Sequence, residues 1–168
     1  ETPVLAQSVE LGDGSFAEKI GSVYQKMLGR SGDVLRIEWG YFYLCGPNGS
    51  EYKSFEEDGK TVISASFPLE EGVCSDLLFA YDDIKCLNYF GTNVDAYWKT
   101  KGLSMEQALV EAKNESGEML EKCRKISEEL FDDAENAGGE KYAELLELSY
   151  RQLIAAHKLA VDTEGQII

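Results

Sequence analysis

The segment SMEQALVEAKNESGEMLEKC, residues 104–123, divides the sequence into two parts with different patterns. Its apolar residues recur at spacings of three and four, which is the period of an amphipathic helix. Ser104 and Gln107 form a capping-box pattern, in which each side chain bonds the other residue's backbone N–H. The pattern predicts a long helix that starts after Ser104, carries one narrow apolar stripe and ends at Gly138-Gly139.

A second helix is predicted from Glu140 onward. Its apolar residues, from Tyr142 to Val161, cover more than one face. A helix that is apolar over so much of its surface needs neighbours on several sides, which a single partner helix cannot supply. We therefore expect helical structure beyond Ile168, after a turn at residues 162–165.

The part before residue 100 reads as strands separated by turns. Residues 34–45, VLRIEWGYFYLC, are rich in β-branched and aromatic residues and close on Gly-Pro-Asn-Gly at 46–49. Further strands are predicted over residues 3–11 and 60–67 and in one long run at 73–90. The expected fold is α+β: a partial antiparallel β-sandwich in residues 1–102, then a helical hairpin in 103–168, made of a long amphipathic helix and a second helix.

Composition excludes several kinds of partner. The chain carries 31 Asp and Glu against 16 Lys and Arg, for a net charge of −15, and contains no basic cluster. Such a charge repels nucleic acid and anionic membrane surfaces. No apolar run approaches the roughly 20 residues of a membrane span, and we expect no signal peptide, because no stretch from Glu1 onward has the pattern of one.

The cysteines and the single histidine give little support for a metal or redox centre. Cys45, Cys74, Cys86 and Cys123 are irregularly spaced without a C-x-x-C pair, so buried free thiols are favoured over disulfides. His157 is the one histidine, which leaves no His-rich metal centre. We expect no metal and no cofactor.

Several stretches resemble the secreted glutaminase A-like family. The most specific is the uninterrupted series at residues 148–159, LSYRQLIAAHKL; others are 80–91 followed by Tyr97-Trp98, then Asp133-Ala134, Gly138-Gly139 and Tyr142-Ala143, and more loosely residues 3–6, 11–12 and 38–41. The resemblance covers most of this chain but only a middle portion of the family's longer polypeptide. It implies the second half of a β-sandwich followed by the start of an α/α toroid of six hairpins.

The resemblance also implies a chemistry for the parent protein. The family is named for hydrolysis of glutamine to glutamate and ammonia, and it is secreted or periplasmic. On this reading the chain is a fragment at the domain junction, mainly scaffold and inactive alone, whose parent acts on a small-molecule substrate. No catalytic residue is carried over from the family.

Three residues of the second predicted helix are candidates for substrate binding: Arg151, Gln152 and His157. An arginine can bind a carboxylate with two hydrogen bonds. The alternative is structural, with Arg151 and Gln152 bridging helices and His157 packed between them. Asp82 and Asp83 are adjacent on a predicted strand, so they point to opposite faces and cannot form a facing catalytic pair. One should make an inward polar contact and the other should be solvated.

Other functions stay open. Part of a six-hairpin glycoside hydrolase is one, and a non-catalytic sandwich module that binds carbohydrate or a partner protein is another. Trp39, Tyr41 and Tyr43 alternate on one strand face and form either a sugar-stacking platform or part of a buried core. Unpaired sheet edges and an apolar hairpin face predict a homodimer.

Overall fold

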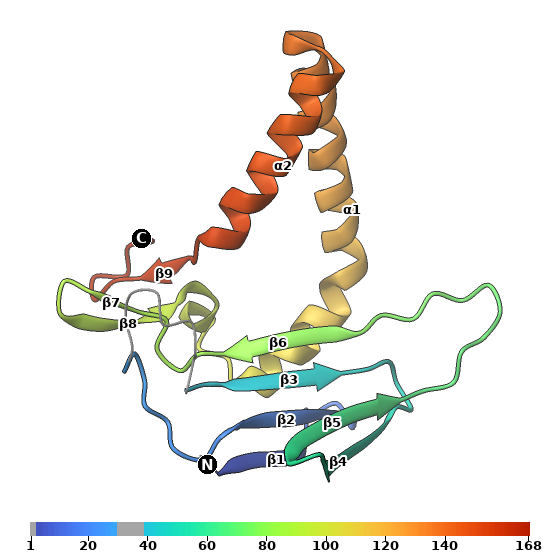
Figure 1. The fold of residues 1–168 in the computed structure, drawn as a ribbon, viewed down its shortest axis with the longest axis vertical. Coiled ribbons are helices and arrows are strands. Elements are labelled where there is room, and N and C mark those ends of the chain that lie inside the picture. Colours follow the sequence, from blue (N-terminus) through green and yellow to red (C-terminus); the bar gives the residue numbers. More distant parts are fainter. Residues whose placement is uncertain (1–2, 30–38) are drawn as a thin grey trace. The chain divides into compact units, whose positions relative to one another are not determined.

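The computed structural model describes residues 3–29 and 39–168, and the fold is α+β as predicted: antiparallel β-structure followed by two helices (Figure 1). The chain divides into two compact units. The first contains Glu1–Glu111 and Ala160–Ile168, and the second contains Ala112–Leu159.

A four-stranded antiparallel sheet forms the centre of the first unit. Its order is β1-β2-β3-β6, from β1 (Val4–Glu10), β2 (Phe16–Ser22), β3 (Tyr41–Cys45) and β6 (Leu78–Asp82). The predicted strand at residues 3–11 is confirmed. The predicted strand at 34–45 is confirmed over Tyr41–Cys45, while residues 34–38 lie outside the described residues.

A hairpin supplies a second layer. It consists of β4 (Glu51–Glu57) and β5 (Lys60–Ser66), which confirms the strand predicted at 60–67. Its two-residue turn places Asp58 and Gly59 at φ 50° and 71°, as a turn that matches the strand twist requires. The hairpin packs across β1, β2 and β3, so this part is sandwich-like (Figure 1).

The long strand predicted at 73–90 is wrong, because the run is broken in the middle. β6 ends at Asp82, and β7 (Leu87–Tyr89) pairs with β8 (Thr92–Ala96) in a separate sheet. Between them the Asp82 carboxylate accepts a hydrogen bond from the Ile84 N–H at 2.9 Å, and Ile84 adopts a φ of 60°. This local turn ends the strand at Asp82, although the alternating side chains in the sequence suggest that the strand continues.

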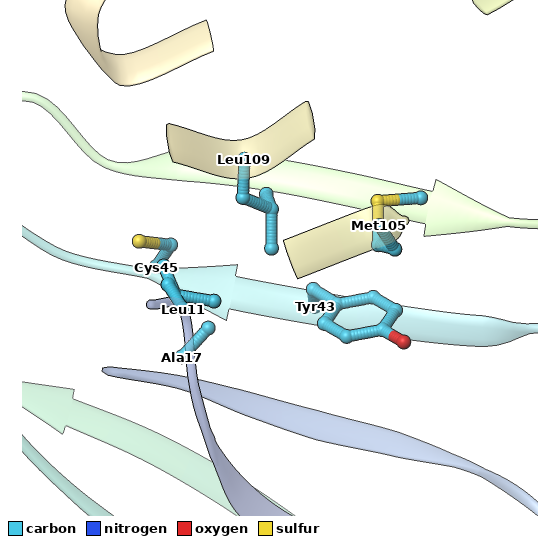
Figure 2. Close-up of a cluster of buried hydrophobic side chains, with 6 residues drawn as sticks. All are labelled: Leu11, Ala17, Tyr43, Cys45, Met105 and Leu109. Atoms are coloured by element: carbon cyan, nitrogen blue, oxygen red, sulfur yellow. The ribbon is translucent and has the colours of Figure 1, made fainter. Parts of the chain in front are cut away.

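The main core lies between the four-stranded sheet and the start of α1 (Met105–Gly138) (Figure 2). Met105 and Leu109 pack onto Tyr43, Cys45, Leu11 and Ala17, and the partly buried Trp98 lines the cluster from the 3₁₀-helix η1 (Tyr97–Lys101). The predicted capping box sets the start of the helix: the Ser104 N–H donates to Gln107 Oε1 at 2.9 Å, and the Gln107 N–H donates to Ser104 Oγ at 3.2 Å. The sequence thus positions the first two turns of α1 on the sheet.

The second unit is a hairpin of α1 and α2 (Glu140–Ala156). Its turn falls at the predicted glycines, with Gly139 at φ 80°. The two helices meet at this turn, where Ala134 and Ala143 are buried, and diverge away from it (Figure 1). Small residues allow the close approach at one end only, so the hairpin opens like a wedge.

The predicted extension of the second helix to Val161 is wrong. α2 ends at Ala156, and Ala160–Val161 form the strand β9, which pairs with β8. Ala160 is fully buried beside Cys86 and Val94. The turn predicted at 162–165 is confirmed, with the Gly165 N–H donating to the Asp162 carbonyl.

Candidate functional site

The wedge between α1 and α2 forms an apolar groove of about 290 Å³, and it is the candidate site of the second unit. Seven apolar or aromatic residues form most of its wall: Leu130, Phe131, Ala143, Leu146, Tyr150, Ile154 and Ala155. Tyr150 and Ile154, which lie on one side of α2 because they are four residues apart, both line it.

Arg151 is the one predicted binding residue that lines the groove. Its side chain is 74% exposed and its guanidinium forms an ion pair with Glu147, one turn earlier on α2. This i, i+4 pair holds the guanidinium at the groove rim. Four of its donors remain directed to solvent or to a ligand, because one N–H occupies the Glu147 carboxylate.

Gln152 and His157 lie apart from the groove lining. Gln152 is exposed on α2. His157 is the first residue after the helix, and its Nδ1 lies 2.6 Å from the Leu153 carbonyl oxygen. Because a carbonyl can only accept, Nδ1 donates, and the ring serves as a helix C-terminal cap. The structure therefore brings Arg151, but not its two predicted companions, to the groove.

A shallower acidic hollow continues the groove along α1. It is lined by Ser127, Phe131 and Glu147, which also line the groove, together with Arg124, Glu128 and Asp132. Arg124 bonds Glu121 through two guanidinium nitrogens, at 3.0 and 2.5 Å, and also bonds Glu128. The hydrogen bonds that the guanidinium donates to Glu121 and then to Glu128 raise the pKa of Arg124 above its usual range. The guanidinium groups of Arg124 and Arg151 on this surface thus already form ion pairs with carboxylates.

The groove by itself lacks the groups that hydrolysis needs. Amide hydrolysis requires an activated nucleophile and a proton donor, and glycoside hydrolysis requires two carboxyl groups across a cleft. The ionisable groups of the groove lining are Glu147, Tyr150 and Arg151, and Glu147 is already paired. Within residues 3–29 and 39–168, no group of three His, Cys, Asp or Glu side chains is arranged to bind a metal.

The expectation that one of Asp82 and Asp83 carries a solvated carboxylate is wrong, because neither side chain is more than about a fifth exposed. Asp82 lies 2.8 Å from Lys99 Nζ, with about a fifth of each side chain exposed, and Asp83 is 6% exposed just after β6. Lys99 also donates to the Ile84 carbonyl at 2.8 Å. Both aspartates belong to the turn that connects β6 to β7.

Of the two alternatives for Tyr41 and Tyr43 of β3, their packing favours the core, because Tyr43 is buried in it and Tyr41 packs against it. Tyr43 is 2% exposed, and Tyr41 packs beside it with Lys19 Nζ 3.9 Å from its ring centroid. Burial raises the pKa of Tyr43, and the nearby Glu106 and Asp82 carboxylates raise it further. Trp39 Nε1 is buried and has no hydrogen-bond partner among the described residues.

The cysteine prediction is half right. None of the four cysteines is in a disulfide; Cys45 and Cys86 are buried, whereas Cys74 and Cys123 are exposed. Cys74 precedes β6 in a segment without regular structure, and Cys123 is exposed to solvent on α1.

Sequence reasoning missed the α1 side of the groove and the ion pair at its rim. Leu130 and Phe131 lie within the predicted long helix, but their place in the groove depends on how the two helices diverge. The Glu147–Arg151 pair has an ordinary sequence signal, since opposite charges four residues apart on a helix are neighbours.

Comparison with family models, with curated proteins and with solved structures finds no match for this chain. No helix among the described residues is both long and apolar enough to cross a membrane.

Proposed function

We propose that this chain is the domain junction of a hydrolase related to the glutaminase A-like family, and that it acts mainly as scaffold. The observation that carries the proposal is the wedge-shaped helical hairpin. α2 exposes apolar side chains around much of its surface, among them Leu145 and Ile154 at about 60% exposure. Helices of this kind are stable when further helices cover them, as in a ring of hairpins.

In the parent protein the reaction is hydrolysis of glutamine to glutamate and ammonia. The resemblance over residues 148–159 supports this substrate class. The parent is expected to be secreted or periplasmic, and its catalytic groups lie outside the groove described above. A six-hairpin glycoside hydrolase is the competing activity for the same architecture.

Arg151 is the residue of this chain that we assign to substrate. Its guanidinium lies at the rim of an apolar groove and is more than two-thirds exposed. A substrate carboxylate can share the guanidinium with Glu147, because five N–H donors serve both. Gln152 and His157 remain secondary candidates on the same helix end.

The test is ammonia release measured with a coupled glutamate dehydrogenase assay. The full-length gene product should release ammonia from glutamine, and the 168 residues alone should not. Turnover by the isolated chain would overturn the scaffold role. Activity of the full-length protein on a glycan panel, with none on amides, would overturn the glutaminase assignment.

Arg151→Ala and Arg151→Lys in the full-length protein test the residue itself. Loss of turnover with an unchanged melting temperature in the alanine variant, and a raised KM in the lysine variant, support substrate binding. Lysine retains the charge but not the forked geometry. Equal losses of stability and activity would instead assign Arg151 to helix packing.

A further inference from the structure

The sequence contains the pattern Asn-x-Ser twice, at Asn48-Gly49-Ser50 and at Asn114-Glu115-Ser116. This pattern is the acceptor for N-linked glycans, which occupy the surface of secreted proteins. Because such short triplets also arise by chance, the structure around each asparagine decides whether a bulky sugar chain fits there. The two triplets differ in this respect, since the first lies in a turn and the second lies within α1.

The first triplet forms the tip of the connection between β3 and β4. The Ser50 N–H donates to the Pro47 carbonyl at 3.2 Å, and Gly49 has a φ of 84°. A four-residue turn closed in this way, with its left-handed residue in the third position, is of type II and favours glycine there. Asn48 therefore occupies the second position of a defined turn between two strands.

The tip of this turn stands in open space. Asn48 and Gly49 are both exposed, whereas Ser50 is half-buried at the base. Apart from the two chain neighbours of Gly49, no atom of the described structure lies within 4 Å of the place that a Cβ on this residue would take. A sugar chain attached at the tip thus has room to extend into solvent, as a surface glycan requires.

The serine hydroxyl is placed differently in the two triplets. In the turn, Ser50 Oγ donates to the carbonyl of Pro47 at 2.7 Å, so the hydroxyl folds back to the residue that precedes Asn48. In α1, Asn114 and Ser116 are two residues apart, and side chains at that spacing on a helix do not face each other. The turn therefore presents the amide and the hydroxyl of the triplet together, and the helix does not.

We propose that Asn48 is an N-glycosylation site. In the transfer, the Asn48 amide nitrogen forms a bond to the anomeric carbon of a lipid-linked oligosaccharide pyrophosphate and gives up one proton. The bond between that carbon and the pyrophosphate oxygen breaks, and the lipid pyrophosphate leaves with the electron pair. The proposal rests on the secreted location of the proposed function and on no part of its hydrolase activity.

The test is expression of the full-length gene product behind a cleavable signal peptide, in a eukaryotic host that adds high-mannose glycans. This host supplies the oligosaccharide donor whatever the natural location of the protein. Endoglycosidase H then leaves one N-acetylglucosamine on each occupied asparagine, and peptide mass spectrometry locates it. The remaining sugar also distinguishes glycosylation from deamidation, which turns an asparagine before glycine into aspartate. We expect the sugar on the peptide that contains Asn48 and none on the peptide that contains Asn114.

Four variants test the triplet itself. Asn48→Gln and Ser50→Ala should each abolish the sugar at position 48, since one removes the acceptor amide and the other removes the hydroxyl. Ser50→Thr keeps the hydroxyl and should retain the sugar. Asn114→Gln is the matched control at the second triplet, and it should leave the electrophoretic mobility of the glycosylated protein unchanged. Circular dichroism of the deglycosylated proteins checks that the fold is the same in all of them.

Two results would overturn the proposal. One is an unmodified Asn48 in protein recovered from the medium. The other is a sugar on Asn114 at equal or higher occupancy than on Asn48, which would contradict the argument from the turn. The outcome is separable from the proposed function: a glycosylated protein that releases no ammonia from glutamine refutes only the hydrolase, and an active protein with a bare Asn48 refutes only the glycan.

Discussion

Leu109 links the helical start of α1 to the sheet, and its truncation gives the sharpest test of the core. The side chain is 1% exposed and packs in the cluster with Tyr43, Cys45 and Met105. Leu109→Ala removes buried methyl and methylene groups and leaves a cavity between a helix and a sheet, where collapse is limited. Substitutions of this kind lower the free energy of unfolding by about 2.7–5 kcal/mol.

Urea unfolding followed by tryptophan fluorescence measures the effect, because Trp98 packs against the same cluster. With a slope of about 1–3 kcal/mol/M, the midpoint should fall by roughly 1–5 M. Leu120→Ala is the matched control: the same substitution on the same helix, but at a side chain 60% exposed. Its free energy of unfolding should change by no more than about 0.5 kcal/mol. Equal shifts for the two variants would refute the assignment of the core to the start of α1.

Three further predictions concern other side chains of the chain. Asp82→Asn keeps an acceptor for the Ile84 N–H but loses the charge that faces Lys99, so it should lower stability by about 1 kcal/mol, and Asp82→Ala by more, in thermal melts. The pKa of Tyr43 is raised above its usual 10.0 in the folded state, so the stability that its protonated phenol contributes is fully present below pH 10 and falls as the pH rises above it. Tyr43→Phe should reduce that loss. Urea unfolding at pH 9 to 11.5, a range of about one to two units around the usual pKa, measures the difference. Ellman's reagent should label Cys74 and Cys123 within minutes and the two buried thiols only on unfolding, whereas four fast thiols would contradict the burial of Cys45 and Cys86.

Short sequence patterns correctly predicted the elements whose ends are set by residues close together in the chain. The capping box at Ser104 and the glycines at 138–139 set the ends of α1, and both are visible within a few residues of sequence. The strand at residues 60–67 follows from its composition and from the Asp-Gly turn before it. These features depend on backbone conformation and hydrogen bonds between near neighbours.

Elements that depend on distant partners could not be predicted in this way. β9 is two residues long and exists because Ala160 and Val161 pair with Ala96 and Asp95 of β8. Its apolar residues continue the helical pattern of α2, so periodicity alone extended the helix too far. The break after Asp82 had a local cause, the Asp82–Ile84 turn, but alternation over the longer run concealed it.

The candidate site was predictable only in part. Arg151 and its pairing with Glu147 follow from spacing on one helix. The groove requires two helices that diverge from Ala134 and Ala143, and no periodicity records that divergence. His157 was predicted on the second helix because that helix was expected to continue, whereas α2 ends one residue before it.

The pairing of β9 with β8 makes the helical hairpin an insertion within the first unit, since residues 112–159 lie between two segments of one compact body. The pairing of β8 with β9 therefore closes a long loop, and the entropy of closure depends on whether the intervening residues are ordered. Ordered helices leave fewer conformations to lose when Ala160 docks. Melting of the hairpin and release of the last strand should thus be thermodynamically coupled, and hydrogen exchange at Ala160 should report on the stability of helices that do not contain it.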